Sequence, residues 1–415
     1  MLKDINALTA AAGKAVAETA ITDIHTHLFP PSHDGQLLWG IDEILTYHYL
    51  VAELFTVAPA ELTYEKFWAL PKQAQADLVW EHVFLGHGAM SEAARGAITA
   101  LTELGLDVAG RDLGSVRKWF DNQDINEYIH SVFDLANIDY AVMTNNPFNA
   151  AEADCWRREL PCPDCLKAAL RIDPLLVAWP AAAKAMSEQG YDVGAQCDEK
   201  TFEQVRRFLT DWSKKIQPVY FAASVGADFA YGDDSPASRM IDKAIMPAAD
   251  EAGVPLALMI GVRRAVNPAL RDGGDGVGVA DVSALMRLLQ RHPGAKFLVT
   301  ILSRVNQQEL CVLARKFANL HVFGCWWFCN NPSIVEEMTR QRLELLGTAF
   351  TCQHSDARVL EQVIYKWSHT RKVVADVLAD KYADLFAAGW RPSADEVGRD
   401  VRRIFGGSFA EFLAK

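Results

Sequence analysis

The sequence contains few cysteines for its length and no long hydrophobic run. Only 8 of its 415 residues are cysteine, far below the density of a secreted disulfide scaffold. We expect no signal peptide, and no apolar stretch reaches the roughly 18 residues that a membrane-spanning helix needs. These absences predict a protein of the reducing cytoplasm that has no membrane partner.

Positive charge is also scarce. The chain has 41 basic and 53 acidic residues, which gives a formal net charge of -12 at pH 7. Nucleic acids and anionic membranes attract proteins with an excess of basic residues, so we expect neither as a partner. Half of the residues are hydrophobic, which allows a sizeable core within one large domain.

The motifs of several common enzyme classes are missing or incomplete. We find no phosphate-binding loop and no Gly-x-Ser-x-Gly elbow. The segment 274–278 is rich in glycine but departs from the dinucleotide-binding fingerprint, so it is predicted to be a flexible loop near the cavity. Cys162 and Cys165 have the spacing of a redox or zinc pair, but no second pair accompanies them, and we interpret this spacing as incidental.

The sequence does contain two histidines at the end of its first predicted strand, which begins at Ile21. Positions two apart in a strand project from the same face, so His25 and His27 can reach one divalent metal ion. An isolated His-x-His also occurs by chance as an ordinary hydrogen-bonded pair. Its place at the carboxyl end of a strand, where parallel barrels build their active sites, favours the metal interpretation. A helical segment then adds His48 and Tyr49.

Short β-rich runs separated by helical stretches follow. Eight such runs, including the first, predict an α/β protein with a distorted (β/α)8 TIM barrel. Residues 35–137 show mostly helical periodicity and are predicted to form an insertion beside the active-site mouth. We expect a single barrel domain over residues 1–415. The later runs are 138–144, 167–172, 218–225, 255–261, 296–302, 320–325 and 347–353.

Candidate site residues follow these runs at the edge where a barrel opens. Asp356 with His25 and His27 would make a three-ligand site that leaves room for water or substrate, although Asp356 alone could equally be a helix N-cap. His354, Asp356 and Arg358 alternate, so an extended backbone would point all three the same way.

Larger side chains at the same edge are candidates for substrate binding. Arg171 could clamp a substrate carboxylate, or it could form a structural ion pair with Asp173. Trp326 and Trp327 could fill the core or form a wall for a sugar. The candidate substrate-binding residues are Arg171, Met259, Trp326, Trp327 and Trp367.

The first-strand His-x-His with an aspartate after the eighth strand resembles the amidohydrolase superfamily. Four longer motifs resemble uronate isomerases, and the likeness runs across nearly the whole chain. The runs expected as strands four, five and six lack the bridging lysine or glutamate and the histidines of binuclear hydrolases, so one metal ion is expected rather than two. The motifs are Thr22–Phe29, Trp39–Tyr49, Phe323–Trp327 and Gln353–Arg358.

The resemblance implies an isomerase that interconverts D-glucuronate with D-fructuronate and D-galacturonate with D-tagaturonate in hexuronate catabolism. A proton would move from C2 to C1 through a cis-enediol. It implies that Tyr49 carries this proton with its pKa lowered by Arg358, that His48 polarises the carbonyl, and that Asp356 handles a hydroxyl proton. The implied catalytic residues are therefore His48, Tyr49, Asp356 and Arg358.

The resemblance also implies a cofactor and partners. One divalent metal ion, with zinc favoured, would bind His25, His27 and Asp356, and would anchor the sugar acid together with Arg171. Trp327 and Trp367 would line the sugar. The expected partner is a small-molecule hexuronate, and the likeness suggests a homo-oligomer.

Two other functions stay open. A metal-dependent hydrolase or decarboxylase would use the same barrel, but the missing strand-five and strand-six histidines count against it. A non-catalytic sugar-acid binding protein would not need His48, Tyr49, Asp356 and Arg358 together.

Overall fold

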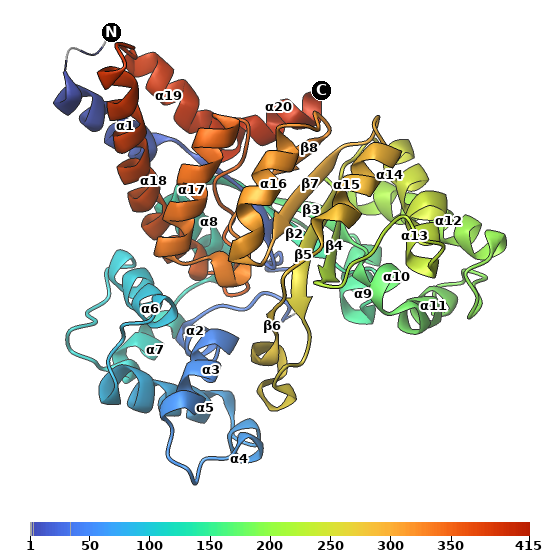
Figure 1. The fold of residues 1–415 in the computed structure, drawn as a ribbon. Helices are drawn as coiled ribbons and strands as arrows, with labels where there is room; N and C mark the ends of the chain where they lie inside the picture. Colours follow the sequence, from blue (N-terminus) through green and yellow to red (C-terminus); the bar gives the residue numbers. More distant parts are fainter. Residues whose placement is uncertain (1, 3, 34) are drawn as a thin grey trace.

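A parallel β-sheet occupies the centre of the protein, here described from a computed structural model (Figure 1). The structure describes residues 2, 4–33 and 35–415. Within them the strands pair in the order β1-β2-β3-β4-β5-β7-β8, and each of these neighbours is parallel. The strands are β1 Ile21–Thr26, β2 Ile138–Asn145, β3 Leu166–Arg171, β4 Phe221–Gly226, β5 Leu256–Arg263, β7 Phe297–Ile301 and β8 Leu320–Val322.

An irregular segment, residues 351–357, closes the gap between β8 and β1. At its start the backbone N–H of Thr351 donates to the carbonyl of Val322 on β8 (3.1 Å). At its end the N–H of Asp356 donates to the carbonyl of His25 on β1 (3.0 Å). The chain therefore forms the distorted (β/α)8 barrel that the alternation of strand and helix predicts.

The eighth predicted run, 347–353, is not a regular strand, and this part of the prediction is wrong. Thr351 makes an isolated bridge to Phe323. Beyond it a side chain takes the place of the ladder, because Gln353 Oε1 accepts hydrogen bonds from the N–H groups of Cys325 (2.7 Å) and His354 (3.0 Å). Because the Gln353 side chain satisfies these backbone N–H groups, the segment does not need an extended conformation to pair them.

The glycine-rich segment predicted as a loop is partly ordered as a strand. β6 (Gly276–Val277) pairs antiparallel with the end of β5 and makes a hairpin with it. Gly278 follows, and its N–H donates to the carbonyl of Gly261 (2.9 Å). Any side chain at Gly278 would collide with Ala227, because its Cβ atom would lie only 2.3 Å from that of Ala227. The hairpin therefore needs glycine there.

Helices fill most of the chain between β1 and β2, coloured blue to cyan below the barrel in Figure 1. Four of them begin at side chains that accept a first-turn N–H, namely Thr63, Ser91, Asp112 and Asp124, which is the usual N-cap arrangement. The elements are α2 Ile41–Leu45, α3 His48–Val57, α4 Tyr64–Trp68, α5 Lys72–Val79, η1 Trp80–Gly86, α6 Glu92–Glu103, α7 Leu113–Asp121 and α8 Ile125–Ala136.

Most of the remaining helices cover the outside of the barrel, and the long helix α18 packs against α1, α6, α8 and α17, whereas η3 packs against α3 and α4 of the insertion. None of the helices in the described residues is both long and apolar enough to cross a bilayer. The elements are α1 Ile5–Glu18, α9 Ala150–Arg157, α10 Asp173–Val177, α11 Trp179–Glu188, α12 Glu199–Ile216, α13 Pro236–Met240, η2 Ile241–Ile245, α14 Met246–Ala252, η3 Pro268–Gly274, α15 Val282–Arg291, η4 Arg304–Asn306, α16 Gln307–Ala314, η5 Trp327–Cys329, α17 Pro332–Leu346, α18 Gln362–Ala387, α19 Ala394–Arg402, η6 Arg403–Gly407 and α20 Ser408–Ala414.

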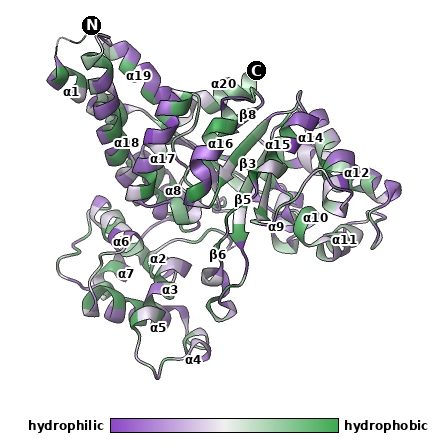
Figure 2. Ribbon diagram, in the orientation of Figure 1, coloured by the Kyte–Doolittle hydropathy of each residue, from purple (hydrophilic) through white to green (hydrophobic). Residues whose placement is uncertain are grey.

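Side chains of the strands divide between two buried cores. One core lies between sheet and helices, and the other lies inside the barrel, where Val142, Ala169 and Leu298 meet. Strands in Figure 2 are accordingly coloured mostly as hydrophobic, with hydrophilic residues on the outer helices. Side chains alternate along a strand, so residues two positions apart point to the same side. Thr144 and Arg171 each follow an interior residue, Val142 or Ala169, by two positions and therefore lie at the carboxyl rim of the barrel interior.

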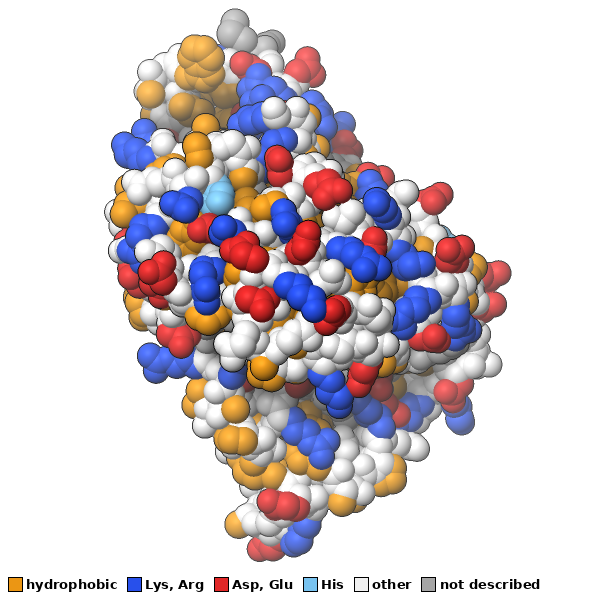
Figure 3. All heavy atoms as spheres, turned by 90° about the vertical axis from the view of Figure 1, so that its right-hand side faces the viewer, with side chains coloured by type: hydrophobic (Ala, Val, Ile, Leu, Met, Phe, Trp, Pro, Cys, Tyr) orange, Lys and Arg blue, Asp and Glu red, His pale blue; other side chains and the backbone are white. Residues whose placement is uncertain are grey.

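The surface face drawn in Figure 3 carries basic and acidic side chains mixed over short distances. Several charged side chains of the protein surface are paired, as in the ion pairs of Lys243 with Glu199 and of Arg291 with Asp242. Exposed pairs of this kind contribute little to stability.

Candidate active site

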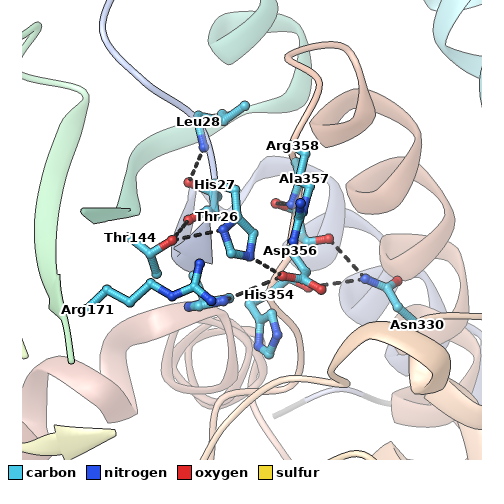
Figure 4. A network of polar contacts seen from close by, with 12 residues as sticks. Thr26, His27, Leu28, Thr144, Arg171, Asn330, His354, Asp356, Ala357 and Arg358 are labelled. Carbon is cyan, nitrogen blue, oxygen red and sulfur yellow. Dashed lines mark hydrogen bonds and ion pairs between the residues drawn. The ribbon is translucent and has the colours of Figure 1, made fainter. Parts of the chain in front are cut away.

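Two histidines of β1 and one aspartate of the closing segment form the centre of the site. His25 Nε2 lies 3.5 Å and His27 Nε2 lies 3.2 Å from Asp356 Oδ1, and Figure 4 shows His27 and Asp356 facing one another. Zinc bonds of about 2.0–2.2 Å in a tetrahedron set neighbouring ligand atoms about 3.3–3.6 Å apart. The three residues therefore have the separation that a shared metal ion requires.

The burial of this group supports the same interpretation. His25 Nε2 and Asp356 Oδ1 are buried and have no hydrogen-bond partner among the described residues. Burial and the charge of Arg358 lower the pKa of His27 to about 3, so its imidazole stays neutral, as a metal ligand must. Within the described part of the chain this is the one group of three such side chains close enough to hold an ion.

Asp356 has an unusual backbone conformation, with φ of 52°. Left-handed φ costs energy for residues other than glycine, least for asparagine and aspartate. The preceding residue is held from both sides: Ser355 N–H donates to Asp23 Oδ1 (2.9 Å), and Ser355 O accepts from Lys366 Nζ (2.5 Å) and Asn330 Nδ2 (3.1 Å). These buried contacts keep the carboxylate aimed at the two histidines.

The same conformation overturns the predicted alternation of His354, Asp356 and Arg358. His354 is fully buried, and its ring lies 5.2 Å from that of His25. Arg358 points instead toward the insertion side, where its Nη1 donates to Asp272 Oδ2 (3.2 Å). A left-handed residue between them turns the chain, so the three side chains do not share one direction.

His48 and Tyr49 begin helix α3, with ring centroids 4.5 Å apart. His48 Nε2 and the Tyr49 hydroxyl are buried without a hydrogen-bond partner among the described residues. Burial, together with the charge of Arg358, lowers the pKa of His48 to about 3, so this imidazole is neutral.

Arg358 lowers the pKa of Tyr49 as expected, but the net shift of this pKa is upward. Burial raises the pKa of Tyr49 well above its ordinary value, and neighbouring Tyr47 and Asp356 raise it further. Arg358 does favour the phenolate, but its effect is outweighed because the phenol is desolvated. Tyr49 is therefore a neutral phenol at neutral pH.

Arg171 forms the structural ion pair with Asp173 that one of its two interpretations predicts. Its orientation is also compatible with the other interpretation, a clamp on a substrate carboxylate. Arg171 Nε donates to Asp173 Oδ2 (2.5 Å), and Asp173 Oδ1 in turn accepts from the N–H of Ser224 (2.5 Å). In Figure 4 the guanidinium extends toward His27 and Asp356. None of the described residues hydrogen-bonds its Nη atoms, so they are available to a carboxylate.

The aromatic candidates divide into two groups. Trp326, Trp327 and Met259 are almost fully buried in the core of the barrel interior. The Trp327 ring lies 5.8 Å from that of His48, and its Nε1 is buried without a partner among the described residues. Trp327 is thus the tryptophan beside the candidate catalytic residues.

Trp367 does not lie where the prediction places it. Its side chain is 0% exposed, and its Nε1 donates to Asp23 Oδ2 (2.8 Å). A fully enclosed ring cannot line a sugar, so the substrate-binding prediction for Trp367 is wrong. Its contact with Asp23 instead supports the hydrogen bonds that hold the Asp356 segment.

Comparison with known proteins identifies the family. Neither a scan of protein-family models nor a search of curated protein sequences finds a match. Among solved structures, the chain is 46% identical to a uronate isomerase from Bacillus halodurans C-125, covering 100% of this chain and 98% of that one with a TM-score of 0.97. The chain belongs to the uronate isomerase family.

Two more distant structures agree in fold. A uronate isomerase from Thermotoga maritima is 15% identical with a TM-score of 0.79, over 98% of this chain and 97% of that one. A glucuronate isomerase from Caulobacter crescentus is 16% identical with a TM-score of 0.72, over 99% of this chain and 94% of that one. At these identities the likeness shows the fold alone.

Two cavities open at the rim of the barrel. One of about 260 Å³ lies between the helical insertion and η3, and His48, Trp68 and Arg358 are among its lining residues. A larger one of about 880 Å³ follows the ends of β4 and β5 and includes Ser224. The smaller cavity is the one that contacts candidate catalytic residues, so we take it as the approach to the site.

Some residues that build the site carry no strong signal in the sequence. Asp23, Lys366 and Asn330 hold the Asp356 segment, yet each is a single polar residue in an ordinary setting. Asp23 could have been noticed, because an aspartate two residues before His25 shares its strand face and is fully buried. No local pattern marks Lys366 or Asn330.

Glu361 links the start of α18 to the insertion of this family member. It is fully buried, its Oε1 accepts from the N–H of Gly40 (3.0 Å), and burial raises its pKa to about 7. Between about pH 4.3 and pH 7 the folded protein keeps a proton that the unfolded chain has released, so the free energy of unfolding falls as pH rises through this window.

Glu361→Gln is expected to remove this fall, because glutamine cannot ionise and still accepts from Gly40. At about pH 8 the variant should be more stable than the wild type by up to a few kcal/mol, and at about pH 4 the two should be similar. Urea unfolding at both pH values measures the difference. An equal pH dependence in the two proteins would show that Glu361 ionises normally.

Proposed function

We propose that this protein is an aldose–ketose isomerase that interconverts D-glucuronate with D-fructuronate and D-galacturonate with D-tagaturonate. The observation that carries the proposal is the 46% identity to a uronate isomerase over the full chain. The grouping of His25, His27 and Asp356 beside His48 and Tyr49 supports it with a site of suitable chemistry.

The reaction moves a proton from C2 to C1 and needs an acid and a base near both carbons. Of the candidates, Tyr49 is neutral, because burial raises its pKa. Burial also acts to raise the pKa of Asp356, but His25 and His27 outweigh it and hold that pKa well below its usual range. Asp356 therefore enters as the ionised base and Tyr49 as the acid.

We assign the proton transfer to these two side chains together. Asp356 takes the C2 proton to form the enediolate, the C2 hydroxyl gives its proton to O1, and Tyr49 gives its proton to C1. The cycle closes when the proton on Asp356 passes to the Tyr49 phenolate. Neutral His48 offers a hydrogen bond to the oxygen on which charge develops, which lowers the free-energy cost of the enediolate.

A metal ion fits the three ligands, with zinc favoured by two imidazoles and one carboxylate. When bound, it would supply positive charge that anchors the oxygens at the acid end of the substrate. Arg171 would share this task, since Asp173 fixes its Nε and leaves the rest of the guanidinium for the substrate carboxylate.

Arg171→Met is expected to raise KM for D-glucuronate by about 10-fold to 100-fold with little change in kcat. The variant loses charged hydrogen bonds that bind ground state and transition state alike. Steady-state kinetics measures both constants. Arg263→Met, which removes an exposed arginine at the end of β5, is the matched control and should leave KM unchanged. An unchanged KM in Arg171→Met would remove Arg171 from the carboxylate clamp.

One time course tests the proposed function against its alternatives. The protein is incubated with D-glucuronate and, separately, D-galacturonate, and proton NMR follows the products. Appearance of the ketose supports the isomerase. Loss of carbon dioxide or another cleavage product would instead favour a hydrolase or decarboxylase, and binding without turnover would favour a sugar-acid binding protein.

The expectations about setting and assembly belong to the same proposal. We propose a reducing cytoplasm as the location, and the eight cysteines, which all carry free thiols, support it. The partner is the small-molecule hexuronate, with neither nucleic acid nor membrane involved. A homo-oligomer is proposed from the family resemblance, and light scattering of the purified protein tests it.

A further inference from the structure

Each histidine of the metal-binding pair is contacted from behind by a buried hydroxyl group. His25 Nδ1 lies 3.3 Å from the hydroxyl of Tyr220, and His27 Nδ1 lies 3.0 Å from Thr144 Oγ1. Tyr220 is 1% exposed and Thr144 is 4% exposed. Thr144 comes from β2, as Figure 4 shows beside His27, and Tyr220 directly precedes β4.

The proton of each hydroxyl is directed to a different acceptor. The Tyr220 hydroxyl donates to the carbonyl of Ile24 (2.6 Å), and Thr144 Oγ1 donates to the carbonyl of Thr26 (3.2 Å). A carbonyl can only accept, and a hydroxyl has one proton to give. Toward the imidazoles, the hydroxyl oxygens of Tyr220 and Thr144 can therefore only accept.

When the Nε2 atoms bind a metal ion, the imidazole atoms that face these hydroxyl oxygens must be donors. In a neutral imidazole one nitrogen carries the proton and the other a lone pair. With the proton on Nδ1, the lone pair lies on Nε2, and the Nε2 atoms of His25 and His27 are those that approach Asp356. The opposite tautomer would set the Nδ1 lone pair against a hydroxyl oxygen, or would turn the hydroxyl away from its carbonyl acceptor.

We propose that Tyr220 and Thr144 are positioning residues that fix His25 and His27 as Nδ1–H tautomers and so prepare both Nε2 atoms to bind a metal ion. Strand β1 takes part, because its own carbonyls at Ile24 and Thr26 orient the hydroxyls. The inference rests on the metal centre of the proposed function and not on the isomerase reaction.

Zinc affinity without any uronate present tests the proposal. We expect Tyr220→Phe and Thr144→Val each to bind Zn²⁺ about 10-fold to 100-fold more weakly than the wild type, measured by competition with a chelator of known affinity. Thr144→Ser keeps the hydroxyl and loses a methyl group, so it should bind as the wild type does. Equal affinity of Thr144→Val and Thr144→Ser would overturn the role of Thr144.

The tautomers are also measurable directly in metal-free Asp356→Ala protein with ¹⁵N-labelled histidine, because in this variant the carboxylate that faces both Nε2 atoms no longer competes for their protons. Long-range proton–nitrogen NMR should show His25 and His27 with the proton on Nδ1, and adding Thr144→Val should remove this preference at His27. A signal with the proton on Nε2 in the Asp356→Ala protein would overturn the proposal. If Tyr220→Phe fails to fold, the Thr144 pair and this spectrum still decide it.

The outcome separates this inference from the isomerase proposal. Weakened zinc binding in a protein that converts no uronate would sustain the tautomer assignment and contradict the proposed reaction. Full conversion of uronate by the wild type, with unchanged zinc affinity in Tyr220→Phe and Thr144→Val, would sustain the proposed reaction and contradict the tautomer assignment.

Discussion

Tyr49→Phe is expected to lower kcat for D-glucuronate by about 10²-fold to 10⁴-fold, the range for loss of a positioned acid or base. The phenol is the neutral acid of the site, and phenylalanine cannot deliver a proton. The Tyr49 hydroxyl has no hydrogen-bond partner among the described residues, so its removal should leave folding and substrate affinity nearly intact. Steady-state kinetics and a thermal unfolding curve measure both effects.

Tyr128→Phe is the matched control for this variant. Tyr128 is also a buried phenol, but it lies in the helical insertion on α8, where its side chain interacts with Glu361. Its loss should leave kcat close to that of the wild type. A Tyr49→Phe enzyme that turns over as fast as the control would remove Tyr49 from the proton transfer.

Asp356→Asn is expected to reduce kcat/KM by about 10³-fold or more and to weaken zinc binding in the same protein. The change removes both a metal ligand and the ionised base. Asparagine has the same shape and tolerates the left-handed φ of 52° found at this position, so the backbone should persist. Kinetics gives the first effect, and metal analysis after dialysis gives the second.

The two effects of Asp356→Asn can be told apart. If zinc is lost while turnover persists, Asp356 serves the metal and another group takes the C2 proton. If zinc is kept and turnover is lost, the carboxylate acts as the base alone. Retention of both would contradict the site built around His25, His27 and Asp356.

The strand order and the metal-binding group follow from local patterns in the sequence. Short apolar runs that alternate with helical stretches predict strands buried on both faces. The spacing of His25 and His27 predicts that both side chains project from one face of a strand. The barrel topology then brings the distant Asp356 to the same rim. Each of these steps needs only the period of a strand and the direction of a parallel sheet.

The closing segment could not be predicted in the same way, because its hydrogen bonds come from residues far along the chain. Ser355 is held by Asp23, which is 332 positions away in the sequence, and by Lys366 on a later helix. Such long-range partners leave no periodic signal. The left-handed turn at Asp356, and with it the direction of Arg358, therefore emerges only in the folded structure.

Burial explains the two other corrections. Trp367 follows the rim residues closely in sequence, but the packing of α18 encloses it completely. The pKa of Tyr49 depends on how far water is excluded from the phenol, which outweighs the charge of Arg358. Neither quantity can be inferred from neighbours in the sequence alone.

The central claim is that this site isomerises hexuronates through removal of the C2 proton. The most direct measurement follows D-glucuronate labelled with deuterium at C2 by NMR, in parallel with the wild type, Tyr49→Phe and Asp356→Asn. We predict that the wild type forms the ketose while the label leaves C2, and that neither variant does so at a comparable rate. Absence of ketose with the wild type, or its formation at the same rate by all three proteins, would contradict the account.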